Sequence, residues 1–372
     1  MNVSADIDRQ DLNAQKGLSA QNGLSAQKTR EDSSQRDSSQ RDLDHQPADR
    51  TGRSRLVFPG LIVLLGVMFA LVPYWGDDVQ MRESFLLAAV YITLASNLNI
   101  MIGYAGYINF GNIVFFGLGG YVCVDLVTRW HWPLVAAALM AGLGVSLLAF
   151  VFGAGILRLR GAFFALATIG VNEAVRQFVA NFEPWGGATG IYLTFDAYEP
   201  LGGPMQALWL VFFLVVGVMV LSLLLSYAIK TSKFGLGLLA IGQNEDAAGV
   251  LGVRTPRHKA LAYSASAFFP AIAGGLYFFK SGIIEPNGAF DLTLSIEAIV
   301  MIMLGGYGTV TGPLLGAFLY EELRGYLLTS PTISQLQLVI AGGLLLAMVL
   351  FAPGGLVGFI HQRWPRMRTI LQ

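Results

Sequence analysis

The sequence predicts an all-α polytopic membrane protein, and its composition is the main reason. Of its 372 residues, 54% are hydrophobic and only 13% are charged, whereas soluble domains carry about 25% charged residues. The charges are also unevenly placed, because nine of the 24 Lys and Arg residues precede Leu56, as do nine of the 24 Asp and Glu residues. Beyond Leu56 the chain is a series of nearly uncharged runs. The run at 208–229 is long enough to cross a bilayer as a helix.

Ten apolar segments predict about ten transmembrane helices. Because Lys and Arg are enriched in cytoplasmic loops, their positions predict the orientation of the chain. If all ten segments cross, thirteen Lys and Arg residues collect on one side of the membrane and three on the other. We therefore expect both termini to lie in the cytoplasm. The ten segments are 56–75, 84–102, 108–127, 133–157, 162–182, 208–229, 260–279, 292–304, 313–330 and 335–352.

We expect three regions along the chain. Residues 1–52 contain polar repeats such as "AQKGLS" and "AQNGLS", which cannot bury a core and predict a disordered, low-complexity tail. Residues 53–360 form the transmembrane domain, and 361–372 form a basic cytoplasmic C-terminal tail. The net charge is zero, which gives no indication of nucleic-acid binding.

The stretch "GYAGYINFGN", residues 103–112, interrupts two apolar runs with three glycines and two asparagines. Glycine lets a backbone leave helical geometry, and freed backbone groups are tolerated at membrane depth only where they line a cavity or contact protein. Two interpretations remain open: a discontinuous helix beside the path of a polar substrate, or a hairpin at the cytoplasmic surface. A similar stretch, "LGGYGTVTGPLLGAF", begins at residue 304, and the predicted topology places both on the cytoplasmic side.

Charged residues inside the predicted spans are functional candidates, because a charge in the bilayer is costly. Glu173 and Arg176 lie three residues apart on one helical face, so they can neutralise each other as an intramembrane ion pair. A contact with substrate is the alternative. Glu297, in "LSIEAIVMIML", has no charged neighbour within one helical turn.

The inside loop contains "AIGQNEDAAGVLGV", in which Glu245 is followed by Ala247, Ala248, Leu251 and Gly252. The pattern predicts a short helix with an apolar face and a glycine stop. Such a helix is either an amphipathic surface element without a special role or a docking helix for a cytoplasmic partner.

Motifs that would indicate an enzyme are missing from the sequence. There is no G-x-S-x-G elbow and no G-x-x-x-x-G-K-[ST] phosphate loop. Cys123 is the only cysteine, so no cysteine-based metal site can form. We expect no catalytic residue, no metal and no cofactor bound by this chain, which leaves transport, conduction or sensing.

From about residue 84 to 358 the sequence resembles the permease subunits of branched-chain amino-acid ABC importers, in particular the LivM-like inner-membrane subunit. Three segments and a closing motif carry the resemblance. They are "NLNIMIGYAGYINFGNIVFFGLGGYV", "LRGAFFALATIGVNEAVRQ" with the later "GGATGI", the long stretch that runs from "AIGQNEDAAGVLGV" to "LGGYGTVTGPLLGAF", and "FAPGGLVG".

The resemblance implies an ABC importer permease fold in the bacterial inner membrane, carrying branched-chain or related amino acids. It also implies four kinds of partner: the lipid bilayer, a second permease subunit, two cytoplasmic ATP-binding subunits that hold ATP-Mg, and a periplasmic substrate-binding protein. The family's "E-x-A-A-x-x-x-G" stretch maps onto Glu245, Ala247, Ala248 and Gly252, with Leu251 between them, as the ATPase-coupling loop. The family's arginines before this glutamate are replaced here by "GLGLLAIG", residues 235–242.

Under this interpretation a half-helix amino terminus meets the substrate carboxylate, and phenylalanines meet its aliphatic side chain. The alternatives are an ABC permease for amides or urea and an ion-coupled secondary transporter, in which Glu173 or Glu297 binds the coupling proton. The candidate substrate-path residues are Gly103, Gly106, Asn109, Gly111, Asn112, Phe115, Phe116, Glu297, Gly305 and Gly308.

Overall fold

The computed structural model describes residues 54–76, 79–328 and 355–358, together with residues 339, 342, 343 and 346. The chain divides into two units, residues 1–56 and 57–372, and the description below concerns the second. The expected tails at 1–52 and 361–372 lie outside the described residues, as does most of the tenth predicted segment, 335–352.

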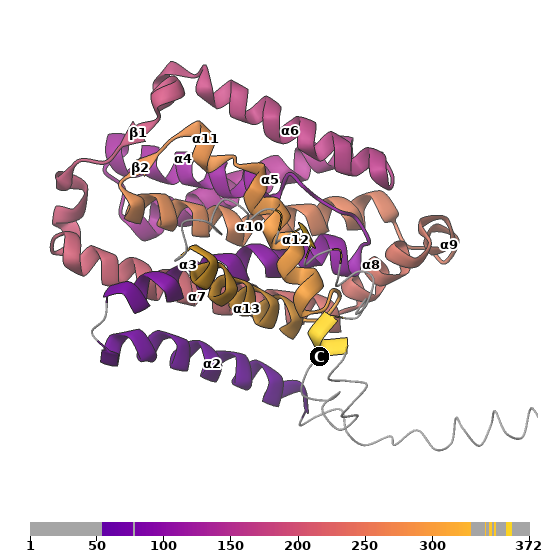
Figure 1. The fold of residues 1–372 in the computed structure, drawn as a ribbon. Coiled ribbons are helices and arrows are strands. Elements are labelled where there is room, and N and C mark those ends of the chain that lie inside the picture. Colours follow the sequence, from indigo (N-terminus) through magenta and orange to yellow (C-terminus); the bar gives the residue numbers. More distant parts are fainter. Residues whose placement is uncertain are drawn as a thin grey trace, which may run out of the picture. The chain divides into compact units, whose positions relative to one another are not determined.

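The described part of the chain is built from α-helices, as predicted, and the protein is an all-α polytopic membrane protein. The first nine predicted segments each coincide with a helix. Among the described residues, seven helices are long and apolar enough to cross a membrane (Figure 1). These are α2 (Ser54–Gly76), α3 (Val79–Asn99), α4 (Asn112–Trp130), α5 (Leu134–Ile156), α7 (Pro204–Thr231), α10 (Thr255–Ser281) and α12 (Leu292–Gly305) preceded by α11 (Pro286–Ala289). Helices α6 (Ala162–Ala180) and α13 (Thr311–Leu328) are not among these seven.

Helix α10 lies at the centre of the bundle and packs against both α4 and α5 (Figure 1). Glycines make the α4–α10 crossing unusually close. A Cβ atom on Gly119 would overlap the backbone of Ala271, and one on Gly274 would overlap the backbone of Phe116. Small residues at such crossings let helix backbones touch, which is how membrane helices associate in lipid.

The connection between α6 and α7, expected to lie outside, is attached to the C-terminal end of α10. It consists of three 3-10 turns and the short strand β1 (Ile191–Tyr192), which pairs antiparallel with β2 (Ile283–Ile284). The Tyr198 hydroxyl donates a hydrogen bond of 2.9 Å to the carbonyl of Phe279. This loop therefore braces the outer end of the central helix.

Helix α3 does not simply turn back into α4. It continues as the π-helical segment η1 (Ile100–Tyr104), after which the chain leaves helical geometry, with a positive φ of 74° at Gly106. Helix α4 then begins at Asn112, whose amide reaches the carbonyl of Leu94 in the middle of α3. The start of α4 thus lies about 15 Å back along α3 from Tyr104, at a rise of about 1.5 Å per residue. Helices α3 and α4 are thus joined by a non-helical stretch that returns along α3 before α4 begins.

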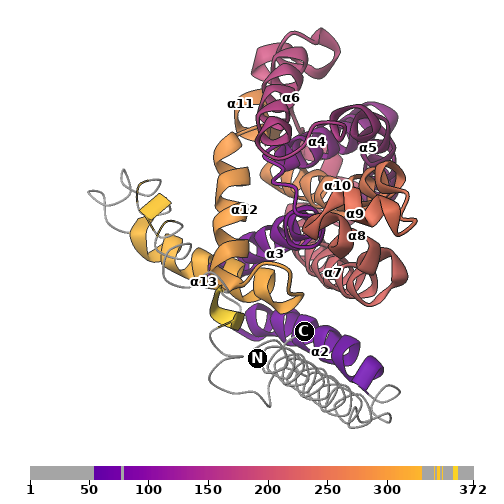
Figure 2. The same cartoon turned by 90° about the vertical axis from the view of Figure 1, so that its right-hand side faces the viewer.

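The inside loop forms two short helices, α8 (Lys233–Gln243) and α9 (Glu245–Val250), which lie side by side beyond the start of α10 (Figure 2). The Ser232 side chain caps α8, and the Asn244 side chain caps α9 by accepting hydrogen bonds from the backbone of Asp246 and Ala247. Such caps are strongly preferred at helix starts. They fix where this surface segment begins.

Candidate transport path and docking segment

The two glycine-rich stretches lie against each other. The Asn99 amide, at the end of α3 just before the first stretch, binds the second: its Oδ1 accepts from the Gly308 backbone at 3.0 Å and its Nδ2 donates to the Thr309 carbonyl at 2.9 Å. A Cβ atom on Gly103 would collide with the backbone of Gly308, so the two stretches are in direct contact. Lys230 donates to the Gly308 carbonyl at 2.9 Å. Both stretches therefore lie on the same side of the domain. Gly305 instead packs on the backbone of α13, at Gly312.

Two asparagines beside the first stretch keep unused hydrogen-bonding capacity. Asn109 Oδ1 accepts from the Gly111 backbone at 3.0 Å. Among the described residues, Asn109 Nδ2 and Asn112 Oδ1 are buried and have no hydrogen-bond partner. Buried polar atoms are usually partnered, so this place suits a small polar molecule at the start of α4.

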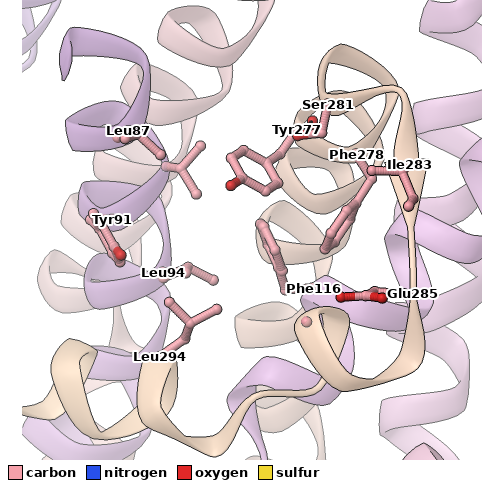
Figure 3. Close-up of a pocket in the computed structure, with 12 residues that line it drawn as sticks. Leu87, Tyr91, Leu94, Phe116, Tyr277, Phe278, Ser281, Ile283, Glu285 and Leu294 are labelled. Carbon is pink, nitrogen blue, oxygen red and sulfur yellow. Dashed lines mark hydrogen bonds between the residues drawn. The ribbon is translucent and has the colours of Figure 1, made fainter. Parts of the chain in front are cut away.

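A cavity of about 300 Å³ lies between α3, α10 and the start of α12 (Figure 3). Leu87 and Leu94 face Tyr277 and Phe116 across it, and Glu285 adds a carboxylate at one side. Mostly apolar walls with a few polar groups are typical of small-molecule sites. The remaining lining residues are Val90, Tyr91, Phe278, Ser281, Ile283, Gly288 and Leu294.

The two phenylalanines predicted to line the path face different places. Phe116 lines the cavity. Phe115 packs edge-on against Tyr263, with ring centroids 5.1 Å apart, in a separate part of the core. The structure thus brings only one of them to the cavity.

Glu297 is buried in a polar network between α3, α12 and α13. The Tyr91 hydroxyl donates to Glu297 Oε2 at 3.3 Å and accepts from Arg324 at 2.8 Å. Arg324 also pairs with Glu321 at 3.5 Å. Glu297 lacks a charged neighbour on its own helix, as the sequence indicates, but α13 supplies Arg324 nearby. Because Tyr91 also lines the cavity, this network reaches the cavity wall.

Glu173 and Arg176 form the predicted ion pair, at 2.6 Å. Arg176 also donates to Asn287 Oδ1 at 2.7 Å. The side chains are 52% and 31% exposed, respectively, so the pair sits on the outward side of α6 and is not enclosed in the core. It takes no part in lining the cavity.

The predicted short helix of the inside loop is α9, and its tip is apolar and exposed. Val250 is 89% exposed and Leu251 is 80% exposed, whereas Ala248 is buried. Gly252 follows with a positive φ of 89°, a conformation that glycine adopts without strain and that ends the segment. We call residues 245–252 the docking segment.

Glu245 points into the protein and not toward a cytoplasmic partner. Its Oε1 accepts from Lys259 at 2.7 Å, and its Oε2 accepts from Tyr107 at 2.6 Å and pairs with Arg160 at 3.2 Å. Lys259 is itself buried and also donates to the Leu157 carbonyl at 2.7 Å. Burial alone would raise the pKa of Glu245, but the hydrogen bonds from Lys259 and Tyr107 and the nearby cations lower that pKa below its usual value.

Sequence reasoning did not single out Tyr107, Lys259 or Arg160 as a group. Lys259 and Arg160 were counted only as cytoplasmic charges, and Tyr107 only as a member of the glycine-rich stretch. A lysine placed where a membrane helix begins was the available signal, because a buried amine needs a partner. The pairing joins residues up to 152 positions apart, and nothing in the local sequence pattern indicates it.

A bundle of membrane-crossing helices, with a non-helical break between α3 and α4 and a cavity among the helices, is the architecture of a multi-pass membrane protein. The family model "Branched-chain amino acid transport system / permease component" matches residues 80–349. The chain belongs to this family of transport permease components.

Several curated permeases are similar to this chain. The branched-chain amino acid permease protein LivM of Escherichia coli K12 is 28% identical over 73% of this chain and 68% of its own length. The permease protein LivH of Salmonella typhimurium is 25% identical over 75% of this chain and 94% of its own length. The autoinducer 2 import permease LsrC of Photorhabdus luminescens is 31% identical, but over only 36% of this chain and 41% of its own length.

Proposed function

We propose that this chain is the membrane-spanning permease subunit of an ATP-driven importer for branched-chain or related amino acids. It forms half of the substrate path and takes its energy from a separate cytoplasmic ATPase. The observation that carries this proposal is the docking segment, whose exposed Val250 and Leu251 stand at the end of a loop tied to the path through Glu245. Large apolar side chains at a capped, defined tip are typical of a protein-binding surface.

The relatives support the first of the proposed partners, a second permease. The chain is similar to both LivM and LivH, two permeases of the same named system, which supports a second permease subunit beside this one. Two cytoplasmic ATP-binding subunits hold ATP-Mg, and a periplasmic protein delivers the substrate. The placement of Lys and Arg supports an inner-membrane orientation with both termini in the cytoplasm.

The docking segment yields a direct test of ATPase binding. Replacing Leu251 with aspartate puts a charge into the proposed apolar contact, and central apolar contacts of this kind are worth about 2 kcal/mol or more. We expect the tagged variant to recover about thirtyfold less ATP-binding subunit from native membranes than wild type does. The control, Leu251→Met, keeps the apolar surface and recovers a wild-type amount. Undiminished recovery with Leu251→Asp would contradict this role for the segment.

The cavity supports a substrate with an apolar side chain and an ammonium group. Its leucine and phenylalanine walls suit a branched aliphatic chain, and Glu285 at the side suits the cation (Figure 3). We expect Glu285→Gln to raise the KM for leucine uptake about tenfold, since hydrogen bonds to charged groups contribute about 1.5–3 kcal/mol. Glu183→Gln makes the same charge change on the outer connection, away from the cavity, and leaves the KM unchanged. Equal KM values for the two variants would remove Glu285 from the site.

A further inference from the structure

A docking helix needs only an exposed face, yet Glu245 also forms a buried group with Lys259 and Tyr107. We propose that these three side chains form a rigid junction through which the docking segment moves the non-helical stretch at 105–111. This inference rests on the proposed function, because it assigns to these residues the transfer of motion from the ATPase to the path. They act as positioning residues and need not touch the substrate.

On the docking side, the junction is anchored in three separate elements. Glu245 is the first residue of α9, and Lys259 lies in the first turns of α10. Arg160, from the connection between α5 and α6, bonds both to Glu245 and to Asp246 beside it. A displacement of α9 therefore cannot leave the Glu245 carboxylate behind without breaking several charge-assisted hydrogen bonds, which are stronger than neutral ones.

On the side of the proposed substrate path, the junction is joined to the backbone of the non-helical stretch through Tyr107. Tyr107 belongs to the non-helical stretch, and its backbone N–H donates to the Met101 carbonyl at 2.9 Å. Its ring lies under the Lys259 ammonium, 4.9 Å from the ring centroid. Next to it, a Cβ on Gly106 would stand 3.2 Å from the Cα of Gly242 in α8, so the two backbones are in contact. Asn99, at the end of α3, connects this region to the second glycine-rich stretch by accepting a hydrogen bond from the Gly308 backbone N–H.

The stretch at 105–111 is the part of this region that can change shape. It lies between π-helical η1 and the start of α4 and contains Gly106, at a φ that other residues rarely adopt. Packed helices shift as rigid bodies, and a few loop residues absorb the change. A rigid contact to a non-helical stretch can move that stretch by itself. The same contact to a continuous helix would have to move the whole helix. A coupling role requires an element that can adopt two conformations. We assign that part to residues 105–111.

The test compares two tyrosines that differ in one respect. Tyr107→Phe removes the hydroxyl that joins Glu245 and Lys259 but keeps the ring, which packs edge-on against Phe164. Tyr104→Phe removes a buried hydroxyl, three residues away, that bonds to Ser226 in α7 and not to the docking segment. The complete transporter, purified with its partner subunits, is placed in liposomes, and leucine uptake is measured per ATP hydrolysed.

We expect Tyr107→Phe to retain the ATP-binding subunits and to hydrolyse ATP, while uptake per ATP falls about tenfold. Tyr104→Phe stays close to wild type, and Lys259→Met shows a loss at least as large as that of Tyr107→Phe. A wild-type ratio in Tyr107→Phe would overturn the junction. If wild type itself showed no ATP-driven uptake, the proposed function would fail, and the junction would be judged by the following measurement.

That measurement is hydrogen–deuterium exchange on the purified chain, which needs no partner and no ATP. In Lys259→Met we expect residues 105–111 and 245–252 to exchange faster together, because one connection holds both. Faster exchange confined to 245–252 would show that the docking segment is not joined to the path, and would overturn the inference whatever the transport assay gives.

Discussion

Replacing Gly274 with alanine is expected to cause a large loss of stability. The new Cβ would overlap the carbonyl of Phe116, a backbone atom that cannot rotate away. Relief requires α4 and α10 to move apart at the centre of the bundle. Overpacking a filled core costs about 1–3 kcal/mol and at times more, and we expect about 3 kcal/mol here. The midpoint of unfolding in a detergent titration measures it.

Gly217, in the middle of α7, provides the matched control. A Cβ atom there meets nothing within 4 Å, so alanine adds a methyl without a collision. Because alanine favours helix over glycine by up to about 1 kcal/mol, Gly217→Ala should be neutral or slightly more stable. Identical unfolding midpoints for the two variants would show that α4 and α10 are not in backbone contact.

Replacing Asn99 with leucine is expected to reduce ATP-driven uptake about a hundredfold while leaving the ATP-binding subunits attached. The change keeps the size of the side chain but removes both hydrogen bonds that hold the second glycine-rich stretch against the end of α3, next to the first stretch. Each bond to a buried partner is worth about 1–3 kcal/mol when it is broken on one side only. The two stretches would then no longer keep a defined spacing.

Ser222→Ala is the control for this prediction. It removes the hydroxyl that accepts from Asn97, two residues before Asn99 on α3, in a buried contact of 2.7 Å with α7. Asn97 keeps a second bond to the Thr93 carbonyl, so uptake should change less than about threefold. Wild-type uptake by Asn99→Leu would mean that the contact between the two stretches has no part in transport.

The helices could be predicted from the sequence because each is a long apolar run bounded by charges or glycines. The break after α3 could also be predicted, because glycine and asparagine interrupt an apolar run there. Freed backbone groups are tolerated at membrane depth only where they line a cavity or contact protein. The sequence could not show that the second stretch packs on the first. The Asn99 contact spans 209 positions, and helical periodicity carries no information at that distance.

The orientation of Glu245 is the clearest case of what the sequence left undetermined. Helix α9 has only six residues, too few for a pattern to indicate which face is buried. The polar network around Glu297 was hidden for a similar reason, because Tyr91 and Arg324 come from other helices. Most of the cavity wall was not foreseen either, since it comes mainly from α3, α10 and the segment leading into α12; of the predicted path residues only Phe116 of α4 lines it. Each of these features arises from packing between helices.

We propose that this permease moves amino acids by using ATP hydrolysed on partner subunits. Uptake of radiolabelled leucine tests this directly, in liposomes that contain the complex purified on this chain, with the periplasmic binding protein supplied outside. We expect uptake that requires ATP on the cytoplasmic face and stops with a non-hydrolysable analogue. Uptake by this chain alone, driven by an ion gradient without ATP, would contradict it.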